Sequence, residues 1–142
     1  MKPARHITLT GAEGNRLEAE IWGSAGHPVI LLHGGGQTRH SWSGATRGLA
    51  GRGYRVINID ARGHGESDWS PDSSYSFDDL VLDVEAVLAD VTTPFALVGA
   101  SMGGGTSIHA VARGLRPSAV VLVDIVPELE DEGVHRIRDF MA

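Results

Sequence analysis

Apolar and polar residues alternate along the first part of the chain. Between residues 16 and 22 every second side chain is apolar, a pattern typical of a half-buried strand. Residues 6–10 alternate in the same way, and the glycine-containing stretch at 11–15 joins the two segments. The pattern therefore predicts a β-hairpin at the start of the chain.

Beyond residue 28 the pattern changes to short apolar runs separated by helical periodicity. Val29–Leu32 is a continuous apolar run, typical of a strand buried on both faces. Apolar residues recur at helical spacing from Phe77 to Leu88, and Ser76 with Asp79 three residues later predicts a capping box in front of them. Further strands are expected at 54–59, 95–99 and 119–123, and further helices at 42–52, 102–113 and 127–141.

This order of elements predicts an α/β fold with a mostly parallel sheet flanked by helices, because strands that alternate with helices pair through crossover connections. In such sheets, ligands bind beyond the carboxyl ends of the strands. Three loops follow strands at that end, at residues 33–41, 60–70 and 99–105. We expect a functional site to be assembled from these loops.

Composition narrows the classes of function. The chain has 142 residues, no cysteine and a formal net charge of −6, which favour one domain and argue against thiol chemistry and a nucleic-acid-binding surface. No apolar run approaches ~18 residues, and residues 1–10 lack the apolar core of a secretory signal. We therefore expect a soluble, cytoplasmic protein with no nucleic-acid or membrane partner. The 19 glycines show no collagen-like period, which indicates turns and close backbone approaches.

The strongest chemical signal is the segment Gly99–Gly103, which has the pattern G-x-S-x-G between an apolar strand and a helix. Because the chain must turn from strand to helix within about one residue, Ser101 is expected in strained backbone angles with its hydroxyl exposed at the helix N-terminus. Ser101 is therefore the candidate nucleophile. The alternative is a tight turn with an incidental serine.

A second motif overlaps this one. Gly99, Gly103 and Gly105 also fit the G-x-x-x-G-x-G phosphate loop of short-chain dehydrogenases, and Asp124 ends the next strand, where an acid would bind a ribose. That family places the loop after its first strand and requires Tyr-x-x-x-Lys. Here the loop follows a late strand and Lys2 is the only lysine, so this alternative is disfavoured.

A glycine-rich loop, His33–Gly36, directly follows the buried strand. Consecutive glycines let backbone N–H groups face inward, which suits an oxyanion hole whose second donor is the N–H of the residue after the nucleophile. We assign the two donors to Gly35 and Met102. A phosphate-binding loop is one alternative, although no Gly-Lys-Ser/Thr follows, and a merely flexible loop is another.

The segment Asp60–Ser67 reads Asp-Ala-Arg-Gly-His-Gly-Glu-Ser. An arginine and an aspartate in one tight loop favour a structural salt bridge over a metal or catalytic site. His64 is a base only in principle, since nothing in the sequence supports that role.

Three segments together resemble the α/β-hydrolase superfamily: Leu-Leu-His-Gly-Gly-Gly at 31–36, Asp-Ala-Arg-Gly-His-Gly-Glu-Ser at 60–67 and Val-Gly-Ala-Ser-Met-Gly-Gly at 98–104. The branch they resemble most contains cofactor-free serine hydrolases, among them esterases, enol-lactonases and perhydrolase-type haloperoxidases. The resemblance implies a hydrolase that attacks small-molecule esters or lactones through Ser101 and needs no cofactor or metal. Epoxide hydrolases and dehalogenases share the scaffold but use an aspartate nucleophile, which Ser101 does not match.

The resemblance also implies catalytic partners that the chain supplies only in part. The family's triad runs serine, acid, histidine along the chain. Asp124 is the candidate acid, with a strand-end helix cap as the alternative. His109 lies roughly 12 Å along the helix from Ser101 and is a poor base, His33 and His64 belong to scaffold motifs, and the only histidine after Asp124 is His135.

We therefore expect residues 1–142 to form the N-terminal part of an α/β-hydrolase core with about six of eight strands, and 127–142 to begin a cap or connecting helix. Such a chain is expected to be inactive or weak alone, because a serine without its base loses most of its activation. A non-catalytic binding module and one half of a split enzyme are the alternatives. With the family's strand order, Ala119–Val123 is an apolar sheet edge, so we expect self-association or a partner strand there.

Overall fold

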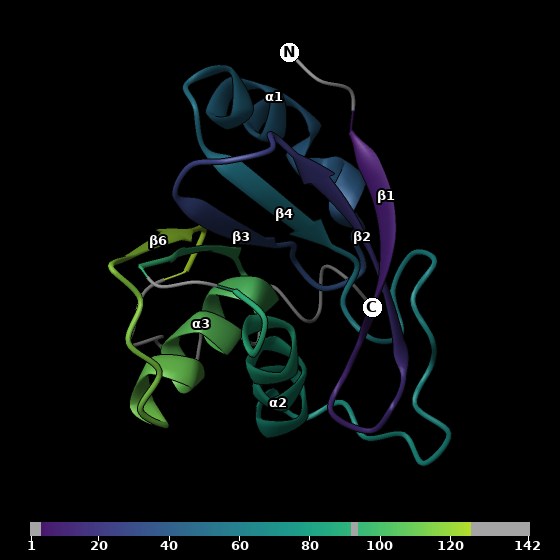
Figure 1. The fold of residues 1–142 in the computed structure, drawn as a ribbon. Helices are drawn as coiled ribbons and strands as arrows, with labels where there is room; N and C mark the ends of the chain where they lie inside the picture. Colours follow the sequence, from purple (N-terminus) through teal and green to yellow (C-terminus); the bar gives the residue numbers. More distant parts are fainter. Residues whose placement is uncertain (1–3, 92–93, 126–142) are drawn as a thin grey trace.

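The computed structural model describes residues 4–91 and 94–125, which are arranged around a six-stranded sheet (Figure 1). The strands are β1 (Arg5–Thr10), β2 (Arg16–Trp22), β3 (Pro28–Leu32), β4 (Arg55–Ile59), β5 (Ala96–Ala100) and β6 (Ala119–Val123). The helices are α1 (Ser43–Gly51), α2 (Phe77–Leu88) and α3 (Met102–Ala112), with a 3-10 turn, η1 (Arg39–Trp42), directly before α1. Each expected strand is present, with boundaries that differ by about one residue.

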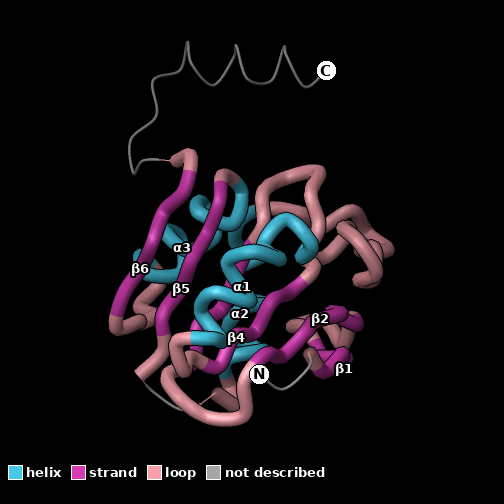
Figure 2. The backbone as a smooth tube through the Cα atoms, turned by 90° about the horizontal axis from the view of Figure 1, so that it is seen from above, coloured by secondary structure: helices cyan, strands magenta, loops and turns pink. Residues whose placement is uncertain are grey.

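The strands lie in the order β1-β2-β4-β3-β5-β6 across the sheet (Figure 2). β1 and β2 form the predicted antiparallel hairpin, and β2 also runs antiparallel to β4. β4, β3, β5 and β6 are parallel to their neighbours, which confirms the predicted α/β class with a mostly parallel sheet. In the described part of the chain β6 pairs only with β5 and forms an edge of the sheet.

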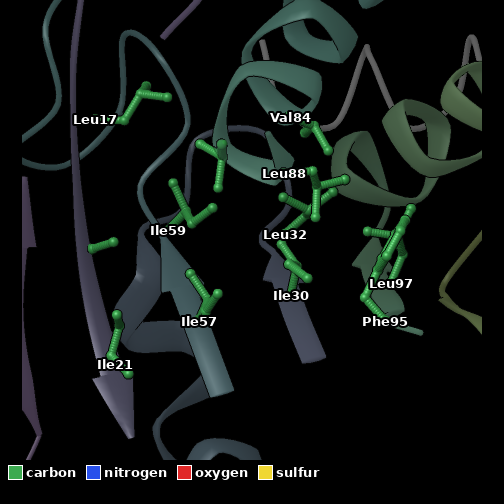
Figure 3. Packing of buried hydrophobic residues seen from close by; sticks show 12 residues of the cluster. Leu17, Ile21, Ile30, Leu32, Ile57, Ile59, Val84, Leu88, Phe95 and Leu97 are labelled. Atoms are coloured by element: carbon green, nitrogen blue, oxygen red, sulfur yellow. The ribbon is translucent and has the colours of Figure 1, made fainter. Parts of the chain in front are cut away.

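Helices cover both faces of the sheet, and β3 shows why. All five residues of β3 are buried, and alternate side chains of a strand point to opposite faces. Ile30 and Leu32 belong to the cluster that α2 covers (Figure 3). Val29 and Leu31 belong to a second cluster, which also contains Leu49 of α1. The apolar side chains of β3 are therefore buried on both faces of the sheet, as the sequence predicts for this strand.

The N-terminus of α2 agrees with its prediction, whereas that of α1 differs from it. Ser76 and Asp79 form the expected capping box, with the two backbone N–H bonds at 3.2 and 3.0 Å. The helix expected at 42–52 is instead preceded by η1, because Thr38 caps an earlier turn by accepting a hydrogen bond from the N–H of His40 at 3.3 Å. The segment expected to begin a cap, 127–142, lies outside the described residues. No described helix is both long and apolar enough to cross a membrane.

Candidate active site

Three loops meet beyond the carboxyl ends of β3, β4 and β5. β3 lies between β4 and β5 and runs parallel to both, so the loops that follow these strands emerge at one edge of the sheet. The loop after β3 approaches the turn after β5: a Cβ built on Gly35 would lie 3.8 Å from the sulfur of Met102. The structure therefore places one predicted oxyanion donor beside the other.

The turn between β5 and α3 is strained at Ser101. This exposed residue has φ 48° and ψ −107°, a combination that residues with a Cβ rarely adopt. Its N–H donates to the carbonyl of Val123 at 3.0 Å, and its side chain makes no capping hydrogen bond. The hydroxyl thus stands at the N-terminus of α3, where unpaired N–H groups favour negative charge.

Glycines surround Ser101 because larger residues would not fit. A Cβ on Gly99 would overlap the carbonyl of Gly103, and a Cβ on Gly103 would overlap the carbonyl of Leu32 in β3. A Cβ on Gly105 would meet the ring of Phe77. The first turn of α3 therefore packs against backbone and an aromatic ring. This close packing explains why a helix begins with three glycines, each of which costs about 1 kcal/mol relative to alanine.

In the loop after β3, two of the three glycine amides have an acceptor. The N–H of Gly34 donates to Oε1 of Gln37 at 3.1 Å, and the N–H of Gly36 donates to Nε2 of His64 at 3.0 Å. The N–H of Gln37 closes a turn onto the carbonyl of Gly34 at 3.1 Å, in which Gly36 has φ 74°, a value that favours glycine. Across residues 4–91 and 94–125, the N–H of Gly35 has no acceptor.

The N–H of Met102 is likewise without an acceptor in the described part of the chain, as is usual for the first residue of a helix. Gly35 and Met102 thus offer two unpaired backbone donors from adjacent segments. Two such donors can stabilise one anionic oxygen, provided that both point at the position which that oxygen occupies.

The segment 60–67 is built on two buried ion pairs. Asp60 accepts hydrogen bonds from the N–H and from Nη1 of Arg39, at 2.6 and 2.5 Å. Arg62 donates to both carboxylate oxygens of Asp83, at 2.6 and 2.7 Å. The expected salt bridge is therefore structural, but Asp60 and Arg62 do not pair with each other, because each partner comes from another segment of the chain.

The surroundings favour the charged forms of Asp60 and Arg62. Burial would raise the pKa of the Asp60 carboxyl, but the N–H groups of Arg39 and Glu66 together with the Arg39 guanidinium hold that pKa below its usual range. The hydrogen bonds to Asp83 raise the pKa of Arg62 in spite of its burial. Among the described residues, no group of three or more His, Asp or Glu side chains is placed to hold a metal ion.

The histidines nearest the site make structural hydrogen bonds. His33 is buried, its Nδ1 lies 2.8 Å from the carbonyl of Gly34, and its Nε2 accepts from the N–H of Ala61 at 3.0 Å. Burial lowers the pKa of His33, although the Gly34 carbonyl and the Asp60 charge partly oppose this effect. His33 is therefore neutral at physiological pH.

His64 and His109 have comparable roles. Nδ1 of His64 lies 3.0 Å from the carbonyl of Arg62, and its Nε2 is the acceptor for Gly36. His109 bonds the carbonyl of Gly105 at 2.8 Å and stacks on Phe77 with ring centroids 4.6 Å apart. The hydrogen bond from Gly36 to His64 was not predicted. No local sequence pattern could indicate it, since the two residues belong to different loops.

Asp124, the candidate acid, lies at the same edge of the sheet as Ser101. It directly follows β6, next to Val123, whose carbonyl accepts the N–H of Ser101. Asp124 is exposed and has φ 55°, which turns the chain sharply at the end of the strand. Its carboxylate has no hydrogen-bond partner in residues 4–91 and 94–125. His135 lies outside those residues.

Comparisons with known proteins agree with this geometry. Residues 27–139 match the model of the alpha/beta hydrolase fold family. The chain belongs to the α/β-hydrolase fold family. This match favours the α/β-hydrolase fold over the short-chain dehydrogenase fold. The antiparallel β1–β2 hairpin and the serine turn after β5 agree with the α/β-hydrolase fold.

Individual members of the family are similar over most of this chain. Protein phosphatase methylesterase 1 of Mus musculus is 32% identical over 126 residues, which are 84% of this chain and 33% of that protein. Esterase Rv0045c of Mycobacterium tuberculosis is 37% identical over 120 residues, 81% of this chain and 38% of that protein. A crystal structure of an alpha/beta hydrolase from Novosphingobium aromaticivorans superposes with a TM-score of 0.86 at 31% identity, covering 99% of this chain and 50% of the other. The chain thus spans a third to a half of the length of these relatives.

Proposed function

We propose that this chain carries the nucleophile and the oxyanion donors of a hydrolase that cleaves ester or lactone bonds through Ser101. The observation that carries the proposal is the strained serine at the start of α3, beside the unpaired N–H groups of Gly35 and Met102. The names of two relatives, an esterase and a methylesterase, support the same class of bond.

In this mechanism Oγ of Ser101 attacks the carbonyl carbon while a general base takes the hydroxyl proton. The carbonyl oxygen becomes an oxyanion that accepts hydrogen bonds from Gly35 and Met102. Collapse of the tetrahedral intermediate breaks the ester C–O bond, and the base returns its proton to the departing alkoxide. Water then hydrolyses the acyl-serine by the same steps, which restores the serine hydroxyl.

The acid and the base are further parts of the proposal. Asp124 is the proposed acid, because it is exposed at the strand end beside the residue that bonds Ser101. His33, His64 and His109 are held by structural bonds, so the proposal assigns the base to none of them. The candidates are His135 and a histidine outside residues 1–142, in the same protein or in a second polypeptide. In the second case residues 1–142 alone are inactive or weak. The split enzyme is the alternative in which a second polypeptide supplies the base.

The edge strand β6 is the proposed place for a partner. Val120, Val121 and Val123 are exposed there, and an unpaired apolar strand readily accepts another strand. A strand from a second copy or from a complementing polypeptide would cover these side chains and continue the parallel sheet. A non-catalytic binding module with the same scaffold is the remaining alternative.

Two measurements test the proposal. The first is p-nitrophenyl acetate hydrolysis by the chain, and the second is the mass of its adduct with a fluorophosphonate, which labels activated serines. We expect Ser101→Ala to abolish the adduct and to lower any hydrolysis by about 1,000-fold or more. Ser73→Ala is the matched control, because Ser73 also has a positive φ, of 58°, but does not begin a helix.

The outcomes separate the alternatives. Hydrolysis lost in both Ser101→Ala and His135→Ala assigns the base to this chain and rules out the binding module. Hydrolysis that appears only when a complementing polypeptide is added supports the split enzyme. Labelling of wild type and Ser101→Ala to the same extent, or hydrolysis that persists in Ser101→Ala, contradicts the assignment of Ser101.

A further inference from the structure

Two histidines join the glycine loop to the segment 60–67 in a reciprocal way. His33, at the start of the glycine loop, accepts the N–H of Ala61 from the other segment at 3.0 Å. His64, in that other segment, accepts the N–H of Gly36 from the glycine loop at 3.0 Å. The two rings lie against each other, with centroids 5.1 Å apart and planes inclined by 55°. Each loop thus supplies one backbone donor and one imidazole acceptor to the other.

These contacts define the tautomer of both rings. In each ring Nε2 faces a backbone N–H, so Nε2 must carry a lone pair and no proton. The proton therefore sits on Nδ1, which faces a carbonyl oxygen: that of Gly34 at 2.8 Å for His33 and that of Arg62 at 3.0 Å for His64. Neither bond from an N–H to Nε2 survives protonation of the ring that accepts it.

The segment that holds His64 is itself rigidly placed. Its first three residues include both members that form buried ion pairs, Asp60 with Arg39 and Arg62 with Asp83. The carbonyl that orients the His64 ring belongs to Arg62, whose side chain is 1% exposed. A ring fixed in this way can fix the amide that it accepts.

We propose that His33 and His64 form a reciprocal staple, in which each ring accepts a backbone N–H from the loop of the other. His64 is a positioning residue in this staple, because it accepts the N–H of Gly36. Among the three glycine amides of the loop, that of Gly35 then remains open to a ligand oxygen. This inference rests on the proposed function for its chemical purpose, but its geometry is testable without any activity. In this arrangement His64 contacts no reacting atom and acts only by holding Gly36.

The tautomers are measurable in the unmodified chain. Two-bond nitrogen-15 correlation spectra of the imidazole rings at neutral pH are expected to show a protonated Nδ1 and an unprotonated Nε2 for both His33 and His64. Free imidazole side chains favour the opposite tautomer, so the result is specific to the staple. A protonated Nε2 on His64 at neutral pH overturns the proposal.

Three variants test the positioning of Gly36. His64→Phe removes the acceptor, and we expect hydrogen exchange of the Gly36 amide to become about 10-fold faster while that of Gly35 stays fast. His64→Gln places an amide oxygen near the former Nε2 and should restore much of the protection. His40→Phe is the matched control, because His40 is exposed and its side chain has no hydrogen bond in residues 4–91 and 94–125.

The outcomes of this test are separate from those of the hydrolase assay. Unchanged Gly36 exchange in His64→Phe, or equal acceleration in His40→Phe, overturns the staple even if Ser101 proves reactive. If His64→Phe does not fold, the tautomer measurement on wild type and the hydrogen exchange of the Gly36 amide in His64→Gln still test the staple. A protected Gly36 together with hydrolysis or labelling that Ser101→Ala leaves unchanged supports the staple and contradicts only the proposed function.

Discussion

Two glycine-rich segments meet at the carboxyl edge of the sheet, and they keep their shapes by different means. In the turn at 99–105, glycine is required because backbone, the Phe77 ring or the Ile125 side chain occupies the space where a side chain would be. In the loop at 34–36, Gly35 and Gly36 have room around them, since no backbone atom lies within 4 Å of a Cβ built on either. That loop is instead held by side-chain acceptors, Gln37 and His64.

The difference teaches how each segment would fail. A turn defined by close packing is sensitive to added volume and insensitive to charge. A loop held by imidazole acceptors and by ion pairs behind them is sensitive to charge and to loss of a partner. The catalytic geometry proposed for this chain depends on both, because one predicted oxyanion donor lies in each segment.

The largest expected effect comes from the ion pair behind the glycine loop. Arg62→Met leaves the buried carboxylate of Asp83 without its cation, and we expect the free energy of unfolding to fall by about 3–5 kcal/mol in urea denaturation. The double variant Arg62→Met with Asp83→Leu should recover part of this loss. Arg113→Met is the control: its pairs, at 3.6 and 3.7 Å, are solvent-exposed, so its loss should stay below about 1 kcal/mol. Equal losses would mean that the Arg62 pair does not anchor the segment.

The next largest loss of stability is expected from a substitution in the tightly packed turn. Gly103→Ala places a methyl group on the carbonyl of Leu32, and we expect a loss of about 3 kcal/mol in the same denaturation experiment, although alanine is the better helix former. Gly48→Ala in α1 is the matched control, because no atom lies within 4 Å of its Cβ position, so it should gain about 0.5–1 kcal/mol. A gain in both variants would contradict the steric explanation.

The loop should respond to pH where the turn does not. Burial lowers the pKa of His33 below its ordinary value of about 6.5, so below that pH the unfolded chain binds a proton that the folded chain does not. Stability is therefore complete above about pH 6.5 and falls as the pH decreases below it, by at most about 1.4 kcal/mol per pH unit for this one proton. The charged or titratable groups around the ring are Asp60, paired with Arg39, and His64.

Unfolding measured between pH 7.5 and 5.5 in wild type and in His33→Gln tests this dependence. The slope should be smaller in the variant, which cannot take up the proton. Ring titration of His33 observed by NMR at or above its ordinary value would contradict the prediction directly.

The same comparison explains what the sequence alone could predict. The serine turn is contained in one pentapeptide between a strand and a helix, so its conformation follows from neighbouring residues. The partners of His33, Asp60 and Arg62 are at Ala61, Arg39 and Asp83, and they meet only because β4 lies beside β3 and α2 packs behind the loop. Such pairings depend on strand order and register, which a local pattern does not contain. The prediction for residues 60–67 was therefore right that the segment holds structural ion pairs and wrong in pairing Asp60 with Arg62.

The smallest expected effect concerns the strain stored at Ser101. Its φ of 48° with ψ of −107° costs a residue that has a Cβ about 1–3 kcal/mol, which glycine avoids. Glycine also gives the unfolded chain more freedom, which offsets about 0.5–1 kcal/mol of that relief. We therefore expect Ser101→Gly to raise the free energy of unfolding by about 1 kcal/mol while it removes the fluorophosphonate adduct. Ser73→Gly is the control, because it changes a second serine of positive φ, 58°, and should leave the adduct in place. If Ser101→Gly were less stable than wild type, the turn would hold its shape through the serine side chain, and the contrast between a turn held by packing and a loop held by acceptors would no longer apply.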